Sequence, residues 1–228
     1  MEPQLSEFLR YLASLDEEDS ERLPTLAEIS HEMGVSVSSL REQLEVARVL
    51  GFVDVRPKCG IKRLPYSFSP TVFQSLSYGV QISPNLFQAY SDLRNHIESA
   101  YFYQAIGLLL PDDHEYLKKL VISAKEKIVS KPIRIPHWEH REFHLVIFRR
   151  LNNLFVLGLL EAYWQLYEAV GLNVYADINY FKQVWSFHEK IVDSLVSGDY
   201  PSAYQALMDH MGLLTTRPAS IQNNHKFE

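Results

Sequence analysis

Residues 23–44 read LPTLAEISHEMGVSVSSLREQL, and this stretch decides how the first part of the chain folds. Thr25 precedes an apolar, helix-periodic segment, and Glu28 follows three residues later, which is the spacing of a capping box at a helix start. Gly34 suits the left-handed turn that ends a helix. The pattern therefore predicts a helix over residues 26–33.

A second helix is expected directly after this turn. Ser36 is a preferred N-cap residue, and Leu40, Leu44 and Ala47 fall on one face of a helix over residues 37–50. Two helices joined by a short turn that contains glycine have the spacing of a helix-turn-helix, a motif that places its second helix in the DNA major groove.

The flanking sequence completes a winged helix-turn-helix. Residues 4–14 carry leucine and phenylalanine at helical spacing and predict a first helix. Residues 52–55 alternate like a strand, residues 57–60 read as a turn, and residues 61–64 return as a partner strand. We therefore expect a domain of three helices and a two-stranded wing over residues 1–66.

From residue 70 onward the pattern is almost wholly helical, so the fold class is mainly α. We expect a C-terminal antiparallel all-α bundle of six to seven helices over residues 70–217, with a tail at 218–228. Proline, glycine and asparagine separate the predicted helices, which cover residues 70–81, 85–108, 112–129, 137–150, 153–171, 178–197 and 200–214.

Composition excludes several classes of protein. The net charge of −6 argues against unselective coating of nucleic acid, which needs many cationic contacts to phosphate. The chain has no apolar run of about eighteen residues and no signal-peptide pattern, so we expect a cytoplasmic protein with no membrane partner. Cys59 is the only cysteine, which excludes a disulfide framework or a cysteine-rich zinc site. Any metal must be held by histidine and carboxylate.

Side chains at the start of the second helix and on the wing are candidates for DNA contact. Hydroxyls and a helix N-terminus can bond phosphate, and Arg41 can address guanine. The cations of the wing, Arg63 included, can contact the phosphate backbone of DNA, or they can simply be solvated charges on a surface hairpin. The sequence leaves both interpretations open. The predicted DNA-binding residues are Thr25, Ser36, Ser38, Ser39, Arg41, Lys58, Gly60 and Lys62.

Four of the nine histidines stand out by their spacing. His140 and His144 are four residues apart on one predicted helix, so both face the same way and can bind one metal ion. His188 and His210 lie on or beside the apolar stripes of the last two predicted helices. A histidine inside a bundle is costly unless it is paired or metal-bound. Alone, each is more simply a core or surface histidine; as a group they predict a divalent metal site.

The order of these patterns resembles a known family. Residues 23–44, the sequence GFVDVRP at 51–57 and Gly60 resemble the DNA-binding domain of GntR-family regulators. In the second half, RNHIE at 94–98 and the histidine pattern resemble the FCD ligand-binding domain of the FadR subfamily. The resemblance covers nearly the whole chain and implies a homodimeric transcription regulator that binds a two-fold, double-stranded DNA operator and responds to a small effector.

The chain departs from this family at two DNA-binding positions. Ala27 and Val37 stand where family members usually carry arginine, while Arg41 matches a family arginine. The resemblance therefore implies a DNA-binding surface with fewer cations than is usual in the family.

The resemblance also implies a set of metal ligands. Metal-binding FCD domains present Asp-x-x-x-His on one helix and one histidine on each of two later helices, and His144, His188 and His210 match the histidines. His140 replaces the aspartate. Without a hard carboxylate ligand, the site should favour Zn or Ni over Mn or Mg. Alternatively, His140 turns away and leaves three ligands.

Open coordination positions on such an ion would suit a small organic acid as effector. Arg94 either pairs with that anion or bridges to Glu98 at i,i+4. Two other functions are compatible with the same residues: a metal-free sensor whose histidines bond an organic ligand, and a metal-dependent hydrolytic enzyme. The enzyme is disfavoured because the carboxylate between the paired histidines, Glu142, projects from another helix face, and no glycine-rich phosphate loop or nucleophile elbow is present.

Overall fold

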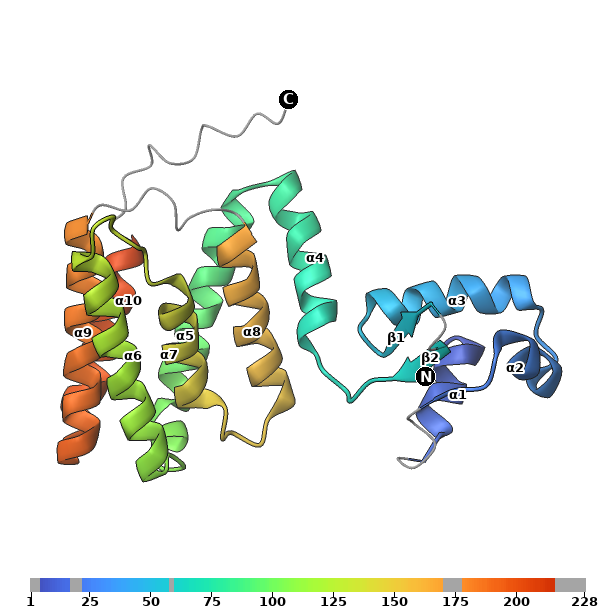
Figure 1. Cartoon of the computed structure of the whole chain (residues 1–228), viewed down its shortest axis with the longest axis horizontal. Coiled ribbons are helices and arrows are strands. Elements are labelled where there is room, and N and C mark those ends of the chain that lie inside the picture. The colour runs from blue at the N-terminus through green and yellow to red at the C-terminus, as the bar shows by residue number, and fades with distance from the viewer. Residues whose placement is uncertain (1–4, 17–21, 58–59, 170–177, 216–228) are drawn as a thin grey trace. The chain divides into compact units, whose positions relative to one another are not determined.

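The computed structural model describes residues 5–16, 22–57, 60–169 and 178–215. The chain divides into two compact units, residues 1–75 and 76–228. The described residues contain ten helices and one two-stranded antiparallel sheet, which confirms the predicted fold class (Figure 1).

The N-terminal unit has the element order of a winged helix-turn-helix. Thr25 and Glu28 form the predicted capping box, Gly34 ends the helix in the left-handed conformation with φ 68°, and the Ser36 side chain caps the next helix. The elements are α1 (Glu7–Ser14), α2 (Leu26–Met33), α3 (Val37–Val49), β1 (Val53–Arg56) and β2 (Gly60–Arg63).

The strands of the wing pair in one antiparallel register, from Val53 opposite Arg63 to Arg56 opposite Gly60. Val53 and Ile61 point from this sheet into a small apolar core. The other buried apolar residues of that core are Phe8, Leu12, Leu23, Ile29, Leu40 and Ala47. These residues fix the second helix of the helix-turn-helix against α1 and the wing.

Beyond the wing, the described part of the chain is mainly helical, as its sequence pattern predicts. Helix α4 crosses the boundary between the two units. In the helical unit, α6 packs against α7 and α9, and α10 packs against α9 and α5. The helices are α4 (Ser69–Ile82), α5 (Asn85–Ile106), α6 (Pro111–Val129), α7 (His137–Phe148), α8 (Leu154–Ala169), α9 (Ile178–Ser197) and α10 (Tyr200–Thr215).

Helix α7 packs against α5, α6 and α8, and it is held by apolar packing and by one ion pair at its end. Phe143, Ile147 and Phe148 are fully buried. Just beyond α7, Arg150 donates to both carboxylate oxygens of Asp113, whose Oδ2 also accepts the Leu110 backbone N–H at the start of α6. One carboxylate therefore caps α6 and ties it to the end of α7.

Some predictions fall on residues outside the described ranges: the first residue of the helix predicted over 4–14, residues 58–59 of the predicted turn, the last two residues of the helix predicted over 153–171, and the whole tail at 218–228. Within the described ranges, none of the helices combines the length and the apolar character needed to cross a lipid bilayer.

Candidate functional site

Most of the predicted DNA-binding residues lie on the surface of the N-terminal unit. Ser36 starts α3 and Ser38 and Arg41 follow on its first turns, all three exposed. Lys62 is exposed on β2. Thr25 at the start of α2 and Gly60 at the start of β2 are also exposed, whereas Lys58 lies outside the described residues. The first turns of α3 and strand β2 thus present these groups to solvent.

Two residues at this surface serve the fold of the unit as well. The Ser39 hydroxyl accepts a hydrogen bond from Gln43, whose other amide atom accepts the backbone N–H of Phe8. Arg63 donates to the carbonyl oxygens of Leu12 and Leu15 at the end of α1. The guanidinium of Arg63 therefore caps a helix rather than standing free on the wing.

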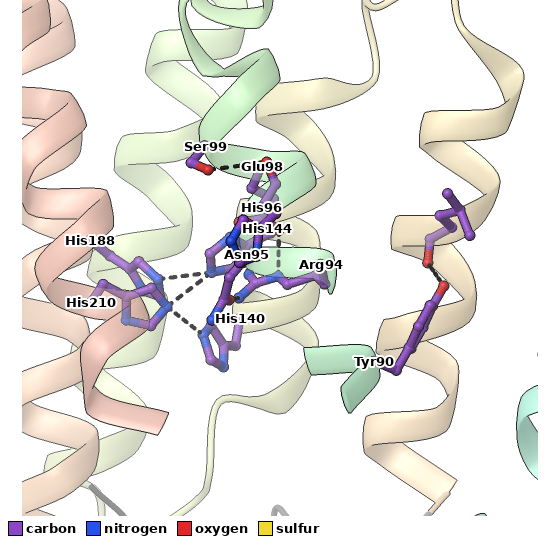
Figure 2. Close-up of polar contacts among 11 residues, drawn as sticks. Tyr90, Arg94, Asn95, His96, Glu98, Ser99, His140, His144, His188 and His210 are labelled. Atoms are coloured by element: carbon purple, nitrogen blue, oxygen red, sulfur yellow. Dashed lines mark hydrogen bonds and ion pairs between the residues drawn. The ribbon is translucent and has the colours of Figure 1, made fainter. Parts of the chain in front are cut away.

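In the helical unit, the four predicted histidines come together at one point (Figure 2). His140 and His144 come from α7, His188 from α9 and His210 from α10. One nitrogen from each ring lies within 4.8 Å of the corresponding nitrogens of the other three. His140 therefore belongs to the cluster and does not turn away from it.

Three nitrogen–nitrogen separations within the cluster are close to those of a coordination shell. His144 Nε2 lies 3.2 Å from His210 Nε2 and 3.3 Å from His188 Nε2, and His140 Nε2 lies 3.5 Å from His210 Nε2. Four nitrogens placed tetrahedrally around zinc at its usual bond length would be about 3.3 Å apart. These three separations are close to that value, and all four nitrogens lie within 4.8 Å of one another, so the cluster is compact enough to hold one ion.

Burial keeps the four imidazoles neutral. His144 and His188 are 0% exposed, and His140 and His210 are 6% and 1% exposed. Burial lowers the pKa of all four well below the ordinary value of 6.5, and the neighbouring Arg94 guanidinium lowers each pKa further. A neutral imidazole keeps the lone pair that a metal ion requires.

A buried ion pair on α5 contacts one member of the cluster. Arg94 Nε donates to Glu98 Oε1 at 2.7 Å, and Glu98 Oε2 lies 3.0 Å from His144 Nδ1. Burial raises the pKa of the Glu98 carboxyl, and the Arg94 guanidinium opposes that rise. The i,i+4 spacing gave the pair between Arg94 and Glu98 as one of two alternatives for Arg94, but nothing in the sequence indicated the contact of Glu98 with His144, 46 residues away.

Aromatic rings surround the cluster. Trp164 lies 4.7 Å from the His140 ring and 5.0 Å from the His144 ring, and Trp185 lies 4.7 Å from the His188 ring, all between centroids. The Arg94 guanidinium carbon lies 5.1 Å from the Trp164 ring centroid. The Trp164 indole nitrogen is buried and makes no hydrogen bond to the described residues. These rings shield the site from water.

The donor set fits a divalent transition ion. Nδ1 of His188 and Nδ1 of His210 are buried without a hydrogen-bond partner within the described ranges. Protons on these atoms would leave both Nε2 lone pairs directed at the centre of the cluster, where a cation would satisfy them. Four imidazoles without a carboxylate match zinc or nickel better than magnesium or manganese.

Comparison with known proteins gives a consistent answer. Residues 90–213 match the FCD domain. The chain is 25% identical over 210 residues to the Uxu operon transcriptional regulator of Escherichia coli, covering 89% of this chain and 80% of that protein. Among solved structures, Streptococcus agalactiae GntR aligns with a TM-score of 0.61 at 18% identity, over 91% of this chain and 94% of that one. Lar of Listeria monocytogenes aligns with a TM-score of 0.50 at 14% identity, over 91% and 92%.

Proposed function

The chain belongs to the GntR-type transcriptional regulators that carry an FCD domain, a class of regulators and not of enzymes, and from that premise we propose that a divalent metal ion in its helical unit controls how its N-terminal unit binds operator DNA. The convergence of four buried imidazole nitrogens from three helices is the observation that carries this proposal.

The proposed ligands are His140, His144, His188 and His210. His140 stands where an aspartate is usual in the family, so the site supplies four neutral nitrogen donors and no charge. Such a set favours zinc or nickel. When bound, the ion would supply a fixed positive charge and would cross-link α7, α9 and α10. The protein residues supply a dry, preformed set of donors.

A small carboxylate is the proposed effector. The bound ion would bring a double positive charge into a buried site whose nearest charged groups, Arg94 and Glu98, offset each other, so an anion would compensate the excess charge. Arg94 and the unpartnered indole N–H of Trp164 are the proposed donors to that anion.

On the DNA side, we propose a homodimer on a two-fold operator, with α3 as the recognition helix. Arg41 would address a base edge, and Ser36, Ser38 and Lys62 would contact phosphate. Control would follow linkage: metal and effector change DNA affinity only by as much as they bind the DNA-competent and incompetent states differently.

Metal binding is tested by purifying the full chain without chelator and measuring bound metal and zinc affinity. We expect about one ion per chain for a single four-ligand site, and loss of tight binding in His188→Ala and His210→Ala. His96→Ala is the matched control, because His96 is an exposed histidine of α5 outside the cluster. A chain that holds no metal, yet binds its operator in response to a carboxylate, would instead favour the metal-free sensor.

DNA binding is tested by fluorescence anisotropy with the DNA upstream of the chain's own reading frame, with zinc and with chelator. We expect Arg41→Ala to cost about 1–3 kcal/mol of specific binding and Lys62→Ala to reduce the salt dependence by about one phosphate contact. Lys118→Ala is the control, since Lys118 pairs with Glu115 on α6 in the other unit. Absence of any specific complex under both conditions would refute regulation through this DNA.

A further inference from the structure

Nδ1 of His144 lies within hydrogen-bond distance of two groups, one of which can only donate a hydrogen bond and the other only accept one. Arg94 Nη2 is 2.8 Å away and Glu98 Oε2 is 3.0 Å away, and all three side chains are 0–1% exposed (Figure 2). An arginine only donates hydrogen bonds and a carboxylate only accepts them. A single ring nitrogen cannot satisfy both partners at once.

Each partner selects a different tautomer of the neutral ring. If Nδ1 holds a lone pair, it accepts from Arg94, and the ring proton sits on Nε2. If Nδ1 carries the proton, it donates to Glu98, and Nε2 keeps its lone pair. The ring carries one proton in both cases, so the exchange changes only which nitrogen holds it.

The surroundings of Nε2 favour the first tautomer when no ion is present. His144 Nε2 lies 3.2 Å from His210 Nε2 and 3.3 Å from His188 Nε2. A proton on His144 Nε2 can bridge to either nitrogen and relieve the repulsion between facing lone pairs. A cation at the same place requires the opposite, because it binds the lone pair of Nε2.

We propose that Arg94 and Glu98 form a tautomer selector for His144: Arg94 bonds Nδ1 in the metal-free protein, and Glu98 takes its place when a divalent ion is bound. This inference rests on the proposed metal site and assigns Glu98 as the residue that orients a ligand. Metal-binding histidines commonly donate their second N–H to a carboxylate, and loss of that carboxylate commonly costs about 10–100-fold in metal affinity. The exchange also couples α5 to the ligands on α7, α9 and α10.

The direct test is nuclear magnetic resonance of the full chain labelled with nitrogen-15 in its histidine rings. The His144 signals are assigned by their loss in His144→Gln. With chelator we expect a bare Nδ1 and a protonated Nε2; with zinc we expect a protonated Nδ1 and a zinc-bound Nε2. The same tautomer in both states, or zinc on Nδ1, would overturn the proposal. Absence of bound zinc would overturn the metal site, and the selector with it.

Two variants separate this role from a merely structural one, because they should move metal affinity differently. Glu98→Gln removes the carboxylate acceptor and should weaken zinc binding about 10–100-fold. Arg94→Met removes the competing donor, so His144 should hold its proton on Nδ1 even with chelator, and zinc should bind at least as tightly as to the wild type. His96→Gln on the same helix should change neither the zinc affinity nor the position of the His144 ring proton. Equal losses of zinc affinity in Glu98→Gln and Arg94→Met would show that the ion pair only supports the fold.

Discussion

Mild acid should destabilise the metal-free helical unit in a pH range where few carboxylates titrate. The perturbation is a change from pH 7.5 to pH 5.5 in the presence of chelator. The four clustered histidines are neutral and buried when folded, with pKa values well below 6.5, but they are free to take up protons in the unfolded chain. The unfolded state therefore binds more protons, and stability must fall as pH falls. The loss begins near pH 6.5 and continues downward until the folded-state pKa values are reached.

The size of the effect follows from the number of buried rings. Each histidine that stays neutral in the folded state costs about 1.4 kcal/mol between pH 7.5 and pH 5.5, so four cost about 5–6 kcal/mol at most. A typical domain is stable by about 5–15 kcal/mol in total. The raised pKa of Glu98 acts in the opposite direction, because protonation of that carboxyl in acid favours the folded state. Burial also raises the pKa of Glu161, which acts in the same direction as Glu98, and lowers the pKa of His137, which adds to the loss. The buried histidines therefore outnumber the opposing carboxyls, and stability should fall on balance.

Urea unfolding followed by tryptophan fluorescence measures this loss. All three tryptophans, Trp138, Trp164 and Trp185, lie in the helical unit, so the signal reports that unit. His188→Leu should reduce the pH dependence by about one quarter of its four-ring maximum, whereas His96→Leu, at an exposed position, should leave it unchanged. Zinc should move the loss to lower pH. A free energy of unfolding that stays constant between pH 7.5 and pH 5.5 would refute the argument that these rings are buried and neutral.

Four further substitutions test other parts of the structure. Thr25→Ala removes the capping box of α2 and should lower stability by about 1 kcal/mol in urea unfolding followed by circular dichroism. Phe143→Ala empties a fully buried position and should cost about 3–5 kcal/mol, read by tryptophan fluorescence. Gly51→Ala should lower the Tm, because Gly51 has φ +77° and an added Cβ would lie 2.6 Å from the Pro70 side chain; an unchanged Tm would contradict this geometry. His140→Asp restores a carboxylate and should shift metal preference from zinc toward manganese in competition titrations, and an unchanged preference would show that this position does not set selectivity.

Much of the N-terminal fold could be predicted because its signals are local. The capping box of Thr25 and Glu28 and the turn at Gly34 each depend on residues a few positions apart. The paired histidines His140 and His144 were predictable for the same reason, since spacing of four residues places both on one helix face.

Other features depend on contacts that spacing does not encode. The pair of Arg94 and Glu98 was visible as i,i+4, but its third member, His144, comes from another helix, and nothing in the sequence says which face of α5 meets α7. Likewise, the sequence predicts Arg63 as a cation of the wing. In the structure its guanidinium donates to the carbonyl oxygens of Leu15 and Leu12 at the end of α1, 48 and 51 residues away. Tertiary packing decides both.

The enclosure of the histidine cluster would set how fast the proposed ion is exchanged. Among the described residues, the four rings are only 0–6% exposed and lie against Trp164 and Trp185, so a metal or a chelator would reach Nε2 poorly while the helices stay closed. Departure of such an ion would then wait for α7 to separate locally from α9 and α10, so it would be governed by local unfolding and not by the strength of one coordination bond. The residence time of the proposed ion, and so any memory of past metal exposure, would then be a property of the helix packing.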